Sequence, residues 1–185
     1  MTENSDKHEI PAAIERFILY WGDMGNVWGV NRSVSQIHAL LYVSERPLSA
    51  EEIAETLGLA RSNVSNSLKE LLTWDLIRRV PIKGDRRDHF EAETDIWELV
   101  TRIAKGRKER ELDPALAALR RCVAEARGDG KVHPVARERL ESMLEFTELM
   151  DRWYVQMLAV PKARLAAVFR MGSKVIELLP LGRAK

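Results

Sequence analysis

The residues of this chain that have the most to offer chemically are short polar side chains and cations gathered between residues 61 and 87. The stretch RSNVSNSLKE at 61–70 places serines and asparagines where these residue types are neutral or poor helix formers. Asparagine amides can read the adenine edge in the major groove of DNA, serine hydroxyls can reach bases or phosphates, and lysine pairs with guanine or phosphate. These residue types favour recognition of a nucleic acid.

Spaced at about 100° per residue, segment 61–74 divides into an apolar stripe and an opposite polar face. The stripe consists of Val64, Leu68, Leu71 and Leu72, and the polar face of Ser62, Asn63, Asn66, Lys69 and Thr73. The N-terminal end of a recognition helix enters the major groove, so we expect Ser62, Asn63 and Asn66 to contact bases. Lys69 is expected at the DNA backbone. Arg61 and Ser65, at the edge of the stripe, are expected at phosphates.

A second group of cations lies in the sequence KGDRR at 83–87. The flanking segments 77–82 and 88–93 have the composition of two short strands, which predicts a hairpin of the kind called a wing. At its tip Lys83, Arg86 and Arg87 would meet phosphates or the narrow minor groove. Asp85 and Asp88 would orient the guanidinium groups through charge-assisted hydrogen bonds. The alternative is an exposed turn that only contacts water.

The element that positions segment 61–74 is a preceding short helix, LSAEEIAETLGL at 48–59. Ser49 and Glu52 have the spacing of a capping box, which marks a helix start. Gly58 supplies the helix end and a tight turn. Short helix, glycine turn and second helix together are the pattern of a helix-turn-helix.

The remaining chain is predicted to be helical on both sides of this motif. A first helix is expected at 9–28, with Gly22, Gly25 and Gly29 loosening its end, and a second is expected to begin at the N-cap Ser33. After the wing, helices are expected at 95–112, 114–127, 134–159 and 162–179. Asp113-Pro114 is either an N-cap with proline at the first helical position or a kink in one long helix. The long apolar stripe of 134–159 requires a partner surface.

Composition sets the broad class of the protein. The 185 residues are 45% hydrophobic, and no apolar run is long enough to span a membrane. The N-terminus is polar and partly acidic, unlike a signal peptide, so we expect a cytoplasmic protein. The net charge is only +1, but residues 61–89 hold seven Lys and Arg against four Asp and Glu. A local positive face can therefore still meet phosphates.

Cysteine and histidine give no sign of a metal or redox centre. Cys122 is the single cysteine, and we expect it to be a small buried hydrophobe in its apolar stretch. The four histidines lie far apart in the sequence, without metal-ligand spacing to a carboxylate or to one another. We expect neither a cofactor nor a metal.

Several of these motifs together resemble the GbsR-like branch of the MarR-type transcriptional regulators. The resemblance rests on Gly25, Trp28 and Gly29 in the pattern GxxWG, on the helix and turn from Ser49 to Gly58, on Val64–Leu71, and on the wing GDRRD at 84–88. The KEREL sequence of the helical tail fits as well. The resemblance implies a homodimer built from N- and C-terminal helices that binds double-stranded DNA and represses transcription.

The same resemblance implies control by a small molecule, since some relatives respond to choline. Aromatic residues could form a cage for a quaternary ammonium ion through cation–π contacts. The candidates are Trp21, Trp28, Trp97 and Trp153, with Tyr20 and Tyr154 beside them. We favour the alternative that these rings pack in the core or in a dimer interface.

The sequence therefore predicts a mainly α fold: a winged helix-turn-helix, with a three-helix core and a two-stranded wing, between N- and C-terminal dimerisation helices. The expected divisions are 1–30 for the N-terminal helix, 31–94 for the DNA-binding domain and 95–185 for the C-terminal helical region. A winged-helix protein-interaction module is the main alternative. No phosphate-binding loop, nucleophile elbow or metal motif appears, so we do not expect an enzyme. Coating of DNA without sequence preference is disfavoured by the low net charge.

Overall fold

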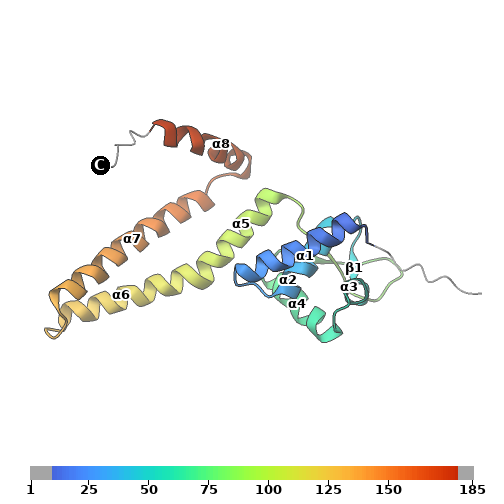
Figure 1. Ribbon diagram of the computed structural model, residues 1–185, viewed down its shortest axis with the longest axis horizontal. Coiled ribbons are helices and arrows are strands. Elements are labelled where there is room, and N and C mark those ends of the chain that lie inside the picture. Colours follow the sequence, from blue (N-terminus) through green and yellow to red (C-terminus); the bar gives the residue numbers. More distant parts are fainter. Residues whose placement is uncertain (1–9, 179–185) are drawn as a thin grey trace, which may run out of the picture. The chain divides into compact units, whose positions relative to one another are not determined.

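The computed structural model describes residues 10–178, including the side chains of α8 up to residue 172 except that of Val168. The chain divides into two compact units, with the division between Leu99 and Val100. Within the described residues, unit 1 contains four complete helices, three short strands and the start of α5, in the order α1, α2, β1, α3, α4, β2, β3, α5 (Figure 1). Their bounds are α1 Ala12–Val27, α2 Arg32–Val43, β1 Leu48–Ser49, α3 Ala50–Leu57, α4 Arg61–Thr73, β2 Ile77–Val80 and β3 His89–Ala92.

The core of unit 1 is formed where α2, α3 and α4 meet. Ile37, Ile53 and Val64, one from each of these helices, have no exposed surface, and Leu71 is 2% exposed. Replacing a large aliphatic side chain at such a position by alanine lowers the stability of the fold by roughly 2–5 kcal/mol. The packing of the three helices therefore fixes the orientation of α4. The predicted three-helix core is confirmed.

The sheet has three strands in the order β1-β3-β2, all antiparallel. The sequence predicted two strands, and both exist with shorter bounds than expected. The third is the two-residue β1, in which Leu48 pairs with Phe90 and Ser49 with His89. Ser49 is thus both a strand residue and the N-cap of α3, and this pairing ties the start of α3 to the base of the wing.

Two predictions about the N-terminal helices were wrong. The N-cap of α2 is Asn31, whose side chain accepts a hydrogen bond from the Ser33 N–H, so Ser33 lies inside the helix. Gly22 and Gly25 do not loosen α1; they are buried within it, where the helix packs on α2. A Cβ at Gly25 would overlap the Ser35 Oγ, so only glycine permits this approach.

The second unit consists of helices. α5 (Ile96–Arg107) begins before the division and leads into a π-helical turn, η1 (Lys108–Leu112), then α6 (Asp113–Gly128), α7 (Pro134–Leu158) and α8 (Lys162–Leu178). The backbone stays helical through Leu112 and Asp113, which decides between the two readings of Asp113-Pro114: the helix continues. Proline cannot donate the hydrogen bond that an α-helix needs there, and the wider turn accommodates it.

α6 and α7 form an antiparallel hairpin (Figure 1). Leu116, Val123 and Ala126 of α6 are buried, and the ion pairs Arg120–Glu148 and Arg127–Glu141 cross between the helices at 3.0 and 2.7 Å. Cys122 is exposed, which corrects its expected burial, because the buried face of α6 passes through Val123 instead. Within the described residues, no helix is both long and apolar enough to cross a membrane.

Candidate nucleic-acid interface

The turn between α3 and α4 is built as its local sequence predicted. The Ser49 hydroxyl accepts from the Glu52 N–H at 3.3 Å, and the Glu52 carboxylate accepts from the Ser49 N–H at 2.7 Å, which completes the capping box. Partial burial alone would raise the pKa of Glu52, but hydrogen bonds from Arg46 and Ser49 outweigh it and lower the pKa to about 2. Gly58 ends α3 in the left-handed region at φ 62°, so the chain turns at once into α4.

α4 has a buried stripe and an exposed arc, as the helical spacing predicted, except that Leu72, which was expected in the stripe, is only partly buried. Val64, Leu68 and Leu71 are buried, and Ser67, at 3% exposed, extends the stripe on one side. The exposed arc contains Arg61, Ser62, Ser65, Asn66, Lys69, Glu70 and Thr73. This arc has no large apolar group, so it offers hydrogen-bonding groups and cations to a partner rather than a hydrophobic surface.

Asn63 differs from the other polar residues of α4 because it is half-buried and already hydrogen-bonded. Its amide donates to the Ser33 hydroxyl at 2.9 Å, which joins α4 to the first turn of α2. The buried Ser67 hydroxyl donates to the Asn63 carbonyl oxygen at 3.4 Å. Sequence spacing alone could not reveal this role, because Ser33 is 30 residues away.

The wing tip is a turn of residues 81–88 between β2 and β3, with Gly84 at φ 89°. Asp85 organises it. Its carboxylate accepts from the Arg87 backbone N–H at 2.9 Å and from the Arg87 Nε at 3.0 Å, and it lies 3.6 Å from the Nε2 of buried His89. Hydrogen bonds from Arg87 hold the pKa of Asp85 well below its usual range, and the same pair raises the pKa of Arg87.

The predicted pairing of Asp88 with the arginines of the tip is not present. Asp88 lies 3.6 Å from Arg79 of β2 instead. The sequence prediction for Asp85 and Arg87 therefore matches the structure, whereas Asp88, the last residue of the turn, pairs with a residue of strand β2.

On α4 and in the wing turn, four exposed cations have no ion-pair partner in the part of the chain that the structure describes. They are Arg61 and Lys69 on α4 and Lys83 and Arg86 in the wing turn. Their charge is not neutralised within the unit, so it is available to an anionic partner. Among residues 10–178, no group of three or more His, Cys, Asp or Glu side chains is placed to hold a metal ion.

The four tryptophans predicted as a ligand cage are divided between the two units. Trp21, Trp28 and Trp97 belong to unit 1, and Trp153 belongs to unit 2. Trp21 packs against Phe17 with ring centroids 5.6 Å apart, and Trp28 and Trp153 are more than half exposed. The cage stays a prediction.

Comparison with known proteins extends this description. Residues 28–88 match the model of the MarR family. The matched segment runs from Trp28 through the helix-turn-helix to the end of the wing turn, which confirms the resemblance predicted from the sequence. The chain is also similar to a solved structure of a transcriptional regulator, with 21% identity and a TM-score of 0.57 over 79% of this chain and 95% of that one.

Three curated relatives come from Bacillus subtilis strain 168. The chain is 25% identical over 48% of its length to the putative HTH-type transcriptional regulator YvaV, and 21% identical over 52% of its length to the HTH-type transcriptional repressor OpcR. It spans about half the length of these two proteins. It is also 23% identical over 68% of its length to the HTH-type transcriptional repressor GbsR, of which it covers 69%.

Proposed function

We propose that this chain, in which residues 28–88 form a MarR-type winged helix-turn-helix, is a cytoplasmic, homodimeric repressor of transcription that binds a specific sequence in double-stranded DNA. One observation carries the proposal. The exposed arc of α4 offers small polar side chains and unpaired cations, on the same unit as a wing turn with two further unpaired cations. A helix of this kind fits the major groove, and a basic turn fits the adjacent backbone or minor groove.

The exposure of each side chain guides our assignment of residues to DNA contacts. Ser62 and Asn66 are exposed near the start of α4, so we assign them to base edges. Arg61, Ser65 and Lys69 are assigned to phosphates. Asn63 is given a positioning role, because its amide is already committed to Ser33.

In the wing, Lys83 and Arg86 are assigned to the DNA backbone or the minor groove. Arg87 is hydrogen-bonded to Asp85, so we assign it mainly the role of fixing the shape of the turn. A phosphate that binds Arg87 would share its guanidinium group with Asp85. Mutation of a phosphate-binding lysine weakens binding to all sequences and reduces the salt slope by about 1.

The homodimer in the proposal is supported by apolar surface that the single chain leaves uncovered. α7 has no buried residue, and it exposes the large apolar side chains of Met143, Phe146, Leu149, Met150 and Trp153. Stepped at about 100° per residue, these five side chains share one arc of the helix. Large apolar side chains each contribute roughly 1.5–3 kcal/mol when fully buried, so this face has a substantial gain available from a second copy. Leu19, Tyr20, Val27 and Trp28 of α1 are exposed as well.

Repression and control by a small molecule are proposed from the relatives. Two of the three are named repressors, and the GbsR-like resemblance implies an effector. The direct test is fluorescence anisotropy of the purified full chain with duplexes from the region upstream of its own gene and with scrambled duplexes of equal length, at about 150 mM salt. We expect at least a thousandfold preference for one native duplex. Equal affinity for native and scrambled duplexes would contradict the proposal and would favour a protein-interaction module.

A further inference from the structure

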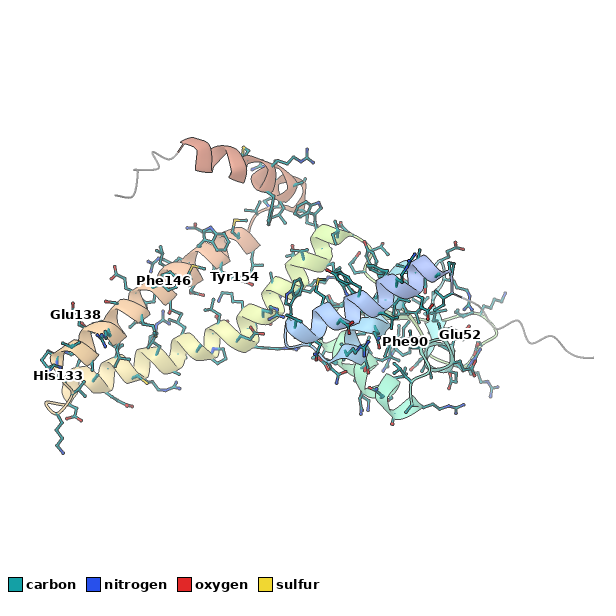
Figure 2. All side chains as sticks on the ribbon, viewed as in Figure 1. Glu52, Phe90, His133, Glu138, Phe146 and Tyr154 are labelled. Carbon is teal, nitrogen blue, oxygen red and sulfur yellow. The ribbon has the colours of Figure 1, made fainter. Side chains whose placement is uncertain are left out.

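A buried histidine stands at the base of the wing turn, and none of the proposed DNA contacts uses it. His89 is the first residue of β3 and is 3% exposed. Its backbone pairs with Ser49 of β1 on one side and with Val80 of β2 on the other. Figure 2 labels Phe90, the next residue of β3, and Glu52, in the first turn of α3. His89 therefore lies where the wing joins the helix-turn-helix.

Both ring nitrogens of His89 face oxygen atoms of the wing turn. Nδ1 lies 3.1 Å from the Arg87 carbonyl oxygen, and Nε2 lies 3.6 Å from the Asp85 carboxylate. A carbonyl oxygen only accepts hydrogen bonds, so Nδ1 carries the proton of its contact. This bond gives a partner to a ring nitrogen that is buried away from water, as buried polar groups require.

The two residues that the ring faces are the ones that give the turn its shape. Asp85 accepts from the Arg87 backbone N–H at 2.9 Å and from the Arg87 Nε at 3.0 Å. The pair with Asp85 is the largest cause of the raised pKa of Arg87, and the carboxylates of Glu52 and Glu51 at the start of α3 raise it further. The turn is therefore held by its own aspartate, by the ring of His89 and by charges on α3.

The conformation of this turn decides where its free cations stand. Lys83 and Arg86 lie on either side of Asp85 in the sequence, and both are exposed. The Asp85 N–H donates to the Ile82 carbonyl at 3.1 Å, which closes the first half of the turn. A loop that is already fixed in its binding conformation does not lose this freedom on association, so it binds more tightly.

From this arrangement we infer that His89 is a positioning residue for the DNA contacts of the wing. Its ring fixes the turn through Arg87 and Asp85. The fixed turn then presents Lys83 and Arg86 to the DNA backbone or the minor groove. This role rests on the proposed function, because it requires that the wing bind DNA.

The contact is tested first in the protein without DNA. Long-range ¹H–¹⁵N NMR of the histidine rings should show a proton on Nδ1 of His89. The amides of residues 83–88 should have high order parameters in the wild type and clearly lower ones in His89→Leu, which fills the buried space without a ring nitrogen. Glu91→Gln is the matched control on β3, and its turn should stay ordered because Glu91 bonds to Arg78 of β2. An unprotonated Nδ1, or equal order in His89→Leu and the wild type, would overturn the inference.

A conservative variant separates the hydrogen bond from the burial of the ring. The amide nitrogen of His89→Asn stands at the same number of bonds from Cβ as Nδ1, so it can donate to the Arg87 carbonyl. Fluorescence anisotropy with the preferred duplex should show about tenfold weaker binding for His89→Leu and at most about threefold for His89→Asn. Equal weakening in the two folded variants, judged by circular dichroism, would overturn the inference. The ring measurement needs no variant, so it decides even where His89→Leu does not fold.

The salt dependence of DNA binding shows whether His89 acts through the wing. Arg86→Met should reduce the salt slope by about 1 in the wild type and by much less in His89→Leu, where the turn no longer holds this cation in place. Lys69→Met on α4 should reduce the slope by about 1 in both backgrounds. A general loss of folding would alter the two comparisons alike.

Two failures of this experiment are distinguishable. If the wild type prefers one native duplex but Arg86→Met has the same effect in both backgrounds, the role of His89 is overturned and the proposed function stands. If the wild type prefers no duplex, the proposed function is overturned, and the role of His89 with it.

Discussion

At the scale of single residues, the most informative contact is the hydrogen bond from Asn63 of α4 to Ser33 of α2. A base-reading asparagine must present its amide to the groove, whereas this amide is half-buried and bonded to another helix. If Asn63 positions α4, its loss and the loss of Ser33 should have the same consequence. If Asn63 reads a base, only its own loss should alter sequence preference.

A double-mutant cycle separates the two roles. Asn63→Ala and Ser33→Ala should each lower the free energy of unfolding by about 1 kcal/mol, and the double variant should lose less than the sum by roughly 0.5–1.5 kcal/mol. Urea unfolding measures the cycle. DNA affinity should fall in parallel, with no change in the preferred base at any position. If Asn63→Ala alone changed the preferred base at one position, Asn63 would be a base-reading residue.

His38 is a second residue whose environment has a measurable consequence. It is 5% exposed in α2, and among the described residues its Nε2 has no hydrogen-bond partner. Burial lowers its pKa to about 4 from an ordinary value of 6.5. Between these two pH values His38 binds a proton in the unfolded chain but not in the folded chain. The stability that neutral His38 supports is therefore present above pH 6.5 and is lost as the pH falls to 4.

The expected loss is about 3 kcal/mol over this range, since one pKa unit corresponds to about 1.4 kcal/mol. The measurement is urea unfolding at pH 7, 5.5 and 4 for the wild type and for His38→Phe, which keeps a ring beside Tyr42. The variant should lose much less stability over the same range. Glu52 and Asp85, whose lowered pKa values act below about pH 4.5, contribute equally to both proteins and cancel in the comparison. Parallel pH profiles would show that His38 does not titrate in this way.

At the scale of elements, α1 and α2 approach so closely that glycine is required at their contact. A Cβ at Gly25 would meet the Oγ and Cβ of Ser35, which are fixed on α2. A Cβ at Gly22 would meet the Cγ of Gln36, which belongs to a flexible side chain. The two glycines therefore differ, although both are buried in the same helix.

Gly25→Ala should lower the midpoint of thermal unfolding, with a loss of about 1–3 kcal/mol from overpacking. Gly22→Ala should cost less, since Gln36 can move and alanine favours the helix by about 1 kcal/mol over glycine. Combining Gly25→Ala with Ser35→Gly should recover part of the loss. Equal effects of the two alanine substitutions would contradict the close approach.

The elements also show which features local sequence could predict. The α3-turn-α4 unit was predicted closely because its signals, the capping box at Ser49, Gly58 and the apolar spacing of α4, all act within a few residues. Strand β1 was missed because its two residues are defined by pairing with β3, about 40 residues later. The burial of Gly25 and the exposure of Cys122 depend on which helix packs opposite, and single-helix periodicity does not contain that information.

The predicted DNA-contact residues also divide into features that nearby sequence determines and features that depend on a distant partner. Exposure on α4 and in the wing turn followed from periodicity and from the turn sequence. The hydrogen bond from Asn63 to Ser33 and the ion pair between Asp88 and Arg79 could not be predicted, since each depends on a partner from another element.

At the scale of the whole molecule, the account depends on a second copy covering the apolar face of α7. Leu149→Glu places a charge on that face and should raise the dimer dissociation constant about 30- to 100-fold, because the carboxylate would be buried without a partner. Leu149 is 56% exposed in the single chain, so the fold of each copy should survive. Arg152→Glu, at an exposed position of the same helix that lies outside this apolar arc, is the control. Analytical ultracentrifugation measures both, and an undisturbed Leu149→Glu dimer would place the interface elsewhere.

The central claim, that α4 reads a specific DNA sequence, is tested most directly by selecting binding sites from a random duplex pool at about 150 mM salt, with the wild type and Asn66→Ala in parallel. The account predicts that the wild type selects a two-fold symmetric site with half-sites about one helical turn apart. Asn66→Ala should select the same spacing but lose the preference at one base pair in each half-site, with a loss of affinity of about 1–3 kcal/mol. A wild-type selection that enriches no sequence, or an Asn66→Ala selection identical to that of the wild type, would contradict the account.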